Sequence, residues 1–310
     1  METNVYKRFL KYRLHPEDVL FFRCIPGNDG EWLFPILEAH FPGEAVFPPS
    51  AADSEAAYTR YPEDARVRFR LVRGDLEYGT GDRAVYHYLS PNPIKITWLR
   101  HPVGRALDLH QQALTRGRVA PNTSLTDYVK SPTGRLDLCN GQARAVVGQT
   151  ARATPGHDTL GYSLEAFQKL AEDNLEQHHF VGFAEEVQRS WHLLHYTFDW
   201  EPASPAHSAG AAPGDIDPEL HAAILSRAEY DLAFYAYAHA MFERRCRQMA
   251  AELLDLESKW RAVGSPLPGP SRTTGLATRI VRAVRRRLPG YRTRARGQGR
   301  RKRAGRSNPG

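Results

Sequence analysis

The sequence is poor in cysteine and has no long apolar run. Among its 310 residues are three cysteines, and they form no CxxC pair and no His/Cys cluster at the spacing of metal ligands. A disulfide framework and a structural zinc site are therefore not expected, and we predict no bound metal. No segment approaches the ~18 apolar residues that a membrane span requires, and the first residues lack the apolar run of a signal peptide. These absences indicate a cytoplasmic protein.

Acidic residues are absent from the last part of the chain. From Arg272 to Gly310 there are 14 Lys/Arg and no Asp/Glu, so of the chain's 42 basic residues 28 remain in residues 1–271, against 35 acidic ones, a balance of −7. Residues 272–310 therefore carry a charge of +14, which with the −7 of the rest of the chain gives the net charge of +7. A body that is mildly acidic argues against a nucleic-acid groove, so a specific nucleic-acid partner is not expected.

What the sequence does contain is an alternation of buried strands and helices. Short runs rich in β-branched and aromatic residues predict strands within 18–25, 67–74, 95–100 and 179–183. Ser163 and Asp217 stand at N-cap positions before amphipathic helices, and a long helical run covers about 229–263. Strands that alternate with helices predict an α/β fold with a parallel sheet flanked by helices.

The composition also divides the chain. We predict one α/β domain over residues 1–263, a Pro/Ser/Gly-rich linker over 264–275, and a tail over 276–310. The first part of the tail places apolar residues on one helical face opposite arginines, which is typical of segments that lie on anionic membrane. The alternative is a solvated, disordered basic terminus. In the first case the protein would sit at the inner face of the membrane.

The stretch from Phe21 to Phe41 carries the main functional signal. A strand, a turn with Gly27 and Gly30, and then a helix is an order that aims backbone N–H groups at an anion, as in P-loop-like folds. This turn, however, holds acidic residues and no lysine. Asn28 followed three residues later by Glu31 also matches a capping box, in which the helix start supplies its own acceptor.

Four blocks of sequence together resemble a known family. They are "FFRCIPGNDGEWLFPILEAHFPGEAVFPP", "KITWLRHPVGRALDLHQQAL", "NGQARAVVG" and "FVGFAEEVQRSWHLL", in that order. In order and spacing they are similar to the carbohydrate sulfotransferases related to heparan sulfate 2-O-sulfotransferase, including bacterial relatives. The resemblance covers about residues 18–245. It implies a P-loop-like fold, PAPS as the sulfuryl donor, and a glycan or similar hydroxyl acceptor.

Measured against that family, the chemical positions are substituted. Gly27 stands where the family has a lysine, Asp108 where a serine binds the 3′-phosphate of the donor, and Asp75 where a histidine is taken as the base. A lysine would stabilise the leaving phosphate, and an aspartate with an ordinary pKa of ~3.9 is a weak base. The resemblance places the donor at Pro26, Gly27, Asn28, Asp29, Gly30, Glu31, Trp32, Arg100 and Asp108.

Several of these residues have two interpretations. Arg100 is suited either to hold a phosphate or to pair with Asp108, and the built-in partner favours the pair. Asn140, Gln142 and Arg144 keep the family's third motif, and they belong either beside the donor or in a hydrogen-bond network at a helix terminus. For Glu185 and Ser190 we expect a structural role.

Two functions follow from the same residues. The first is sulfuryl transfer from PAPS to a glycan or similar hydroxyl, with Asp75 as the base. The second is a catalytically silent sulfotransferase relative that serves as a binding or membrane-associated protein. The four blocks support both, whereas the missing lysine, serine and histidine favour the second. Whether the chain is an enzyme is left open by the sequence.

The tail generates the first prediction. A chain that ends near Gly264 should fold as well as the full chain, because the removed residues have little apolar content. It should also lose affinity for anionic vesicles, and the loss should shrink as salt is raised. Circular dichroism and vesicle sedimentation measure the two effects. Unfolding of the shortened chain would show that the tail packs on the body.

Overall fold

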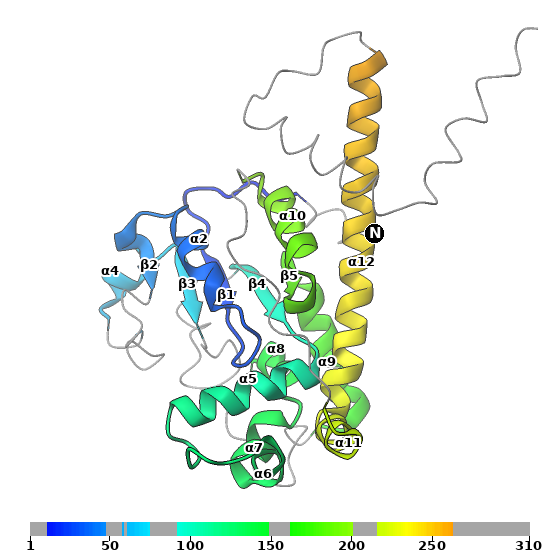
Figure 1. Cartoon of the computed structure of the whole chain (residues 1–310). Coiled ribbons are helices and arrows are strands. Elements are labelled where there is room, and N and C mark those ends of the chain that lie inside the picture. Colours follow the sequence, from blue (N-terminus) through cyan, green and yellow to red (C-terminus); the bar gives the residue numbers. More distant parts are fainter. Residues whose placement is uncertain are drawn as a thin grey trace, which may run out of the picture. The chain divides into compact units, whose positions relative to one another are not determined.

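The computed structural model of the chain describes residues 11–47, 58, 61–74, 92–148, 162–200 and 216–262. It is an α/β protein with a five-stranded parallel sheet in the order β2-β3-β1-β4-β5 (Figure 1). The strands are β1 (Leu20–Arg23), β2 (Val46–Phe47), β3 (Leu71–Gly74), β4 (Ile94–Leu99) and β5 (Phe180–Phe183). The predicted fold class is confirmed at this level.

Helices connect the strands and flank the sheet. They are η1 (Glu31–Leu33), α2 (Phe34–Glu38), η2 (Gly43–Ala45), α4 (Glu63–Arg66), α5 (Pro102–Thr115), α6 (Leu125–Lys130), α7 (Pro132–Leu138), α8 (Gly141–Val147), α9 (Leu164–Glu176), η4 (Ala184–Glu186), α10 (Val187–Phe198), α11 (Pro218–Arg227) and α12 (Glu229–Ala262). The chain divides within α12 into two compact units, residues 1–245 and 246–310. The sheet belongs to the first unit. No helix among the described residues is both long and apolar enough to cross a membrane.

The predicted helix starts are confirmed. The Ser163 side chain accepts a hydrogen bond from the N–H of Ala166, and Asp217 does the same for Leu220, with Pro218 in the first turn. Each cap satisfies one N–H that has no partner inside its helix. The three cysteines, Cys24, Cys139 and Cys246, form no disulfide.

The strand predicted over 67–74 is shorter than expected. It begins only at Leu71, because the chain forms helix α4 and a turn before it, and Val67 is 59% exposed where the alternating pattern placed it inside. The pattern also missed β2, whose two residues are too few to show a period of two. The predicted linker and tail, over 264–310, lie outside the described residues, as does the predicted loop over 201–215.

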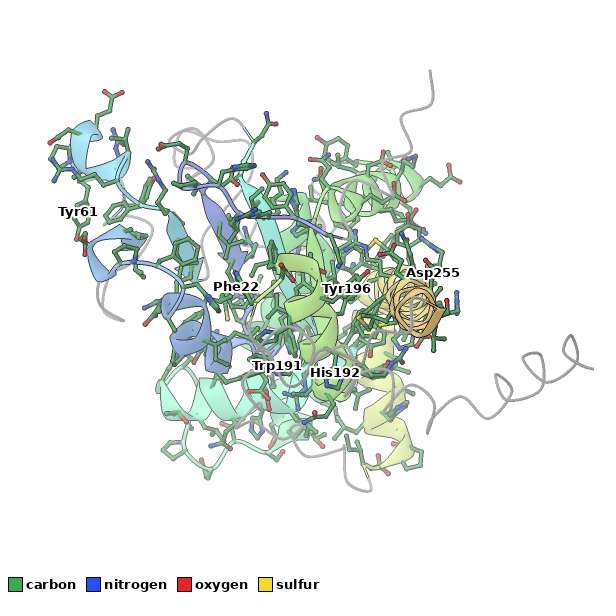
Figure 2. The ribbon with its side chains drawn as sticks, turned by 90° about the horizontal axis from the view of Figure 1, so that it is seen from above. Phe22, Tyr61, Trp191, His192, Tyr196 and Asp255 are labelled. Atoms are coloured by element: carbon green, nitrogen blue, oxygen red, sulfur yellow. The ribbon has the colours of Figure 1, made fainter. Side chains whose placement is uncertain are left out.

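The buried side chains form layers on the sheet. One cluster of Phe47, Tyr58, Phe69 and Val72 joins Phe21 of β1 beside the β2–β3 edge. In Figure 2 Phe22 and Trp191 lie within the packed body, where their exposed fractions are 0% and 1%, while Tyr61 lies out beside α4. A second cluster packs α5 against α6, α7 and α11.

A glycine in β5 tests this packing. Gly182 pairs with Trp98 of β4, and a Cβ at Gly182 would stand 2.2 Å from two atoms of the indole ring. We expect Gly182→Ala to lower the free energy of unfolding by ~1–3 kcal/mol, because the buried ring must shift.

Gly43→Ala is the matched control, since a Cβ there meets no atom within 4 Å. It should change the free energy of unfolding by less than ~0.5 kcal/mol. Urea denaturation of the two variants and the parent measures both values. Equal stability of both variants would contradict the described packing of Trp98.

Candidate functional site

The candidate site lies where β1 and β4 end. The chain runs from β1 to β2 and β3 on one side of β1, and then crosses from β3 to β4 on its other side. Open parallel sheets bind ligands outside the carboxyl ends of strands at such a reversal of strand order. The loop Ile25–Gly30 follows β1, and Arg100 follows β4. The structure therefore brings the first two predicted motifs together at the carboxyl ends of the central strands.

The loop after β1 has no room for a side chain at Gly27. Its φ is +78°, and a Cβ there would lie 2.6 Å from the Cγ of Leu109 and 3.1 Å from the carbonyl oxygen of Arg105, both on α5 (Figure 1). A lysine at this position would be strained in its backbone and would collide with α5. Asp29 also has a positive φ, of 54°.

Asn28 faces β4 and not the helix that follows it. Its side chain is fully buried, and Nδ2 donates to the carbonyl oxygen of Trp98 at 2.8 Å and to Oε1 of Gln142 at 2.9 Å. The residue before η1 is Gly30, which makes no side-chain cap. The predicted capping box of Asn28 and Glu31 is therefore wrong. The Asn28 amide binds partners that are distant in the sequence. Glu31 is exposed and lies in the first turn of η1.

Gln142 extends the end of β4. Its Oε1 accepts from the backbone N–H of Arg100 at 3.0 Å, and its Nε2 donates to the carbonyl oxygen of Arg100 at 2.8 Å. The side-chain amide thus pairs with both backbone groups of one residue, as a neighbouring strand would. With Asn28 bound to the same Oε1, Gln142 ties the loop after β1 to the end of β4.

Arg100 is bound by a carboxylate of its own chain. The guanidinium is nearly buried and pairs with Asp108 on α5, as the sequence predicted. Burial raises the pKa of Asp108, the charge of Arg100 opposes the rise, and the nearby charge of Asp29 adds to it. The carboxylates of Asp29 and Asp108 are therefore close enough to interact electrostatically, and the Arg100 guanidinium pairs with one of them.

A second, more deeply buried ion pair, between Arg105 and Asp231, supports the loop after β1. Arg105 donates to the carbonyl oxygens of Pro26 at 3.2 Å and Asp137 at 3.0 Å, and lies 3.7 Å from the buried Asp231 of α12. Asp231 in turn accepts from the backbone N–H groups of Gln142 and Ala143 at 2.9–3.1 Å. Burial raises the pKa of the Asp231 carboxyl, and the charge of Arg105 opposes the rise. The N-terminus of α8 therefore already holds an internal anion.

The third motif proves to be a network at helix termini. Asn140, with φ of 48°, accepts from the backbone N–H groups of Tyr230 and Asp231 at 3.0 and 3.3 Å. Arg144 donates to the carbonyl oxygens of Cys139 and Leu136 at 2.8 and 2.9 Å. Of the two interpretations left open by the sequence, the hydrogen-bond network describes the contacts of these side chains.

The structure describes all but one of the remaining predicted residues. Glu185 accepts from the backbone N–H of His101 at 2.8 Å and from the hydroxyl of Tyr235 at 3.0 Å, and Ser190 accepts from Phe183 N–H at 2.8 Å, so both have the structural role that was predicted. Trp32 packs edge-on against Trp98, with ring centroids 5.4 Å apart. Asp75, the predicted base, lies outside the described residues.

Sequence reasoning missed Asp231 and the cluster of Glu186, His239 and Glu243 described below. From the sequence, Asp231 is only one of the acidic residues that commonly stabilise the first turn of a helix. The fold shows in addition that its side chain is buried. The signal for the second set was present, because His239 and Glu243 are four residues apart on a helix.

The buried pair generates the next prediction. Asp231→Asn keeps the shape but leaves the Arg105 charge without its partner, so the free energy of unfolding should fall by about 3–5 kcal/mol. Asp173→Asn, which breaks an exposed pair with Lys169, is the control and should cost less than ~1 kcal/mol. Urea denaturation at neutral pH measures both. Equal effects would show that Asp231 does not hold the site together.

Comparison with known proteins does not assign the chain to a family. No family model matches the sequence, and no curated protein matches it. The resemblance to carbohydrate sulfotransferases stays a prediction from the four sequence blocks.

Proposed function

We propose that this chain is a catalytically silent relative of the carbohydrate sulfotransferases, with a P-loop-like fold that serves as a binding protein. A glycine-containing loop that follows the central strand of a parallel sheet and leads into a helix supports the P-loop-like interpretation. The observation that carries the proposal is the ion pair of Arg100 and Asp108. The cation suited to a donor phosphate is held by a carboxylate of α5, eight residues further along the chain.

The negative charges at the carboxyl ends of β1 and β4 disfavour the binding of PAPS. Asp29 and Asp108 lie near each other, and Glu31 follows in the first turn of η1. Repulsion between a phosphate and a carboxylate ~4–8 Å away costs about 2–4 kcal/mol at an effective dielectric constant of ~20. Micromolar binding corresponds to ~8 kcal/mol, so two such carboxylates suffice to abolish it.

The shape of the loop disfavours the donor as well. A lysine that stabilises the leaving phosphate has no place at Gly27, because α5 occupies the space of its Cβ. Asn28, which follows, donates its amide to Trp98 and Gln142. The residues present do not fit PAPS.

The proposal leaves a folded acidic body and a basic tail. The 14 basic residues from Arg272 to Gly310 suit an anionic partner, for which an anionic membrane surface is the first choice. A glycan acceptor held without being sulfated is the other partner class that the resemblance implies. On this view the retained hydrogen bonds at the ends of β1 and β4 keep the body folded, and recognition lies elsewhere.

Calorimetry with adenosine 3′,5′-bisphosphate, the desulfated donor, tests the proposal. The wild-type chain should give no binding heat. Asp29→Gly combined with Asp108→Ser removes both carboxylates, leaves Arg100 available, and asks for no side chain at Gly27. This variant should bind with a dissociation constant below ~100 μM, because removing the two carboxylates relieves about 4–8 kcal/mol of repulsion.

Asp173→Ser on the exposed face of α9 is the control and should bind no better than the wild type. Micromolar binding by the wild type, or sulfuryl transfer that Asp75→Asn abolishes, would overturn the proposal and make the chain a working sulfotransferase. Failure of the double variant to bind would show that more than charge closes the site.

A further inference from the structure

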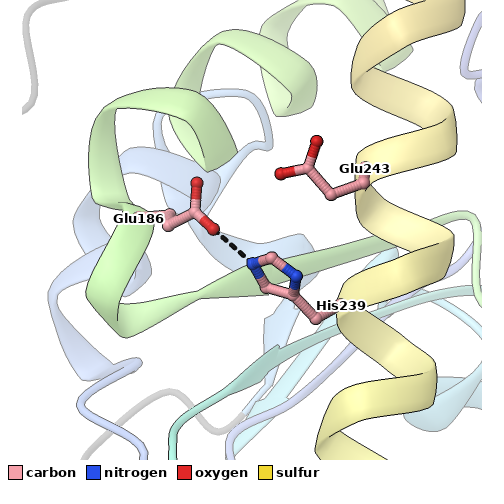
Figure 3. Close-up of side chains that lie close together, drawn as sticks. All are labelled: Glu186, His239 and Glu243. Carbon is pink, nitrogen blue, oxygen red and sulfur yellow. Dashed lines mark hydrogen bonds and ion pairs between the residues drawn. The ribbon is translucent and has the colours of Figure 1, made fainter.

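Three side chains outside the ends of β1 and β4 gather into a cluster with the chemistry of metal ligands. Glu186 ends η4, just after β5, while His239 and Glu243 project from α12 one turn apart (Figure 3). One ligand atom from each lies within 4.8 Å of the others. Their side chains are half-buried, with exposed fractions of 21%, 35% and 29%.

We propose that Glu186, His239 and Glu243 bind a divalent transition-metal ion, with Zn²⁺ the best match. One imidazole nitrogen and two carboxylate oxygens form a three-ligand set that zinc accepts in a tetrahedral site, with water or another ligand in the fourth position. A mixed imidazole and carboxylate set favours zinc and its neighbours over Mg²⁺ and Ca²⁺, which prefer oxygen ligands alone.

The arrangement needs little change to close around an ion. His239 and Glu243 are separated by four residues and therefore share one face of α12. His239 Nε2 and Glu186 Oε1 are already in direct contact, 2.5 Å apart. Ligand atoms on a tetrahedral zinc stand ~3.3 Å apart, given metal–ligand bonds of ~2.0–2.1 Å. Small side-chain rotations bring the three atoms from their present separations to that value.

Arg189 on α10 is the built-in competitor for this site. Its guanidinium pairs with Glu186 and with Glu243, the latter at 2.5 Å, and it lies 5.2 Å from the centre of the Phe242 ring. Partly exposed pairs of this kind contribute little to stability, and two carboxylates outweigh one guanidinium in charge. A metal ion would take the place of Arg189 between the carboxylates, and Arg189 would keep its contact with Phe242.

An ion at this place would join η4 to α12. Glu185, the neighbour of Glu186 on η4, holds the backbone N–H of His101 at the start of α5 and the hydroxyl of Tyr235 on α12. Metal binding would therefore fix the turn that also supports the end of β4. The inference is independent of whether PAPS binds, because no residue of the loop after β1 takes part.

Zinc titration of the full chain, freed of metal with a chelator, tests the site. Calorimetry should show one high-affinity Zn²⁺ ion per chain, and Co²⁺ in its place should give the intense visible absorption of a tetrahedral site. His239→Ala and Glu243→Gln should each weaken binding at least tenfold. Arg189→Met should tighten binding, because it removes the competing cation.

His221→Ala, which removes an exposed histidine on α11, is the matched control and should leave the affinity unchanged. Circular dichroism checks that each variant is folded, and if His239→Ala is not, Glu243→Gln decides. No tight Zn²⁺ binding by the wild type and by Arg189→Met, or binding that His239→Ala and His221→Ala alter equally, would overturn the proposal.

Discussion

The buried pair of Arg105 and Asp231 is the constraint on which the candidate site depends. Asp231 holds the N-terminus of α8 through the N–H groups of Gln142 and Ala143, and Arg105 holds the carbonyl oxygen of Pro26 in the loop after β1. Gln142, placed in this way, reaches the end of β4 and Asn28. One ion pair thus connects four segments that are distant in the sequence. Removing one partner would leave a buried charge without compensation.

Under the proposed function, the same network would allow an anion site to be lost while the fold is kept. Groups that could meet a phosphate are engaged with the protein: Arg100 with Asp108, the α8 N-terminus with Asp231, and the Asn28 amide with Trp98. Internal carboxylates supply the negative charge that a ligand would otherwise bring. The architecture of a donor loop is compatible with a site that stabilises only its own chain.

Much of the fold could be predicted because it depends on local pattern. The strands around β1, β4 and β5 are short apolar runs, and the caps at Ser163 and Asp217 act within three residues. The site was less accessible to such reasoning. The capping box at Asn28 failed because the partners of its amide lie 70 and 114 residues away. Arg100 with Asp108 was predicted, since both belong to one motif, whereas nothing local marks Asp231 as buried.

The most direct test of a donor loop occupied by its own chain is a phosphorus NMR titration of adenosine 3′,5′-bisphosphate with the wild-type protein at moderate salt. The two phosphate resonances should neither shift nor broaden, because Asp108 holds Arg100 and Gly27 leaves no place for a lysine. A saturable shift of both resonances at micromolar protein would contradict this view. It would show that the nucleotide displaces Asp108 and that the loop still works as a donor site.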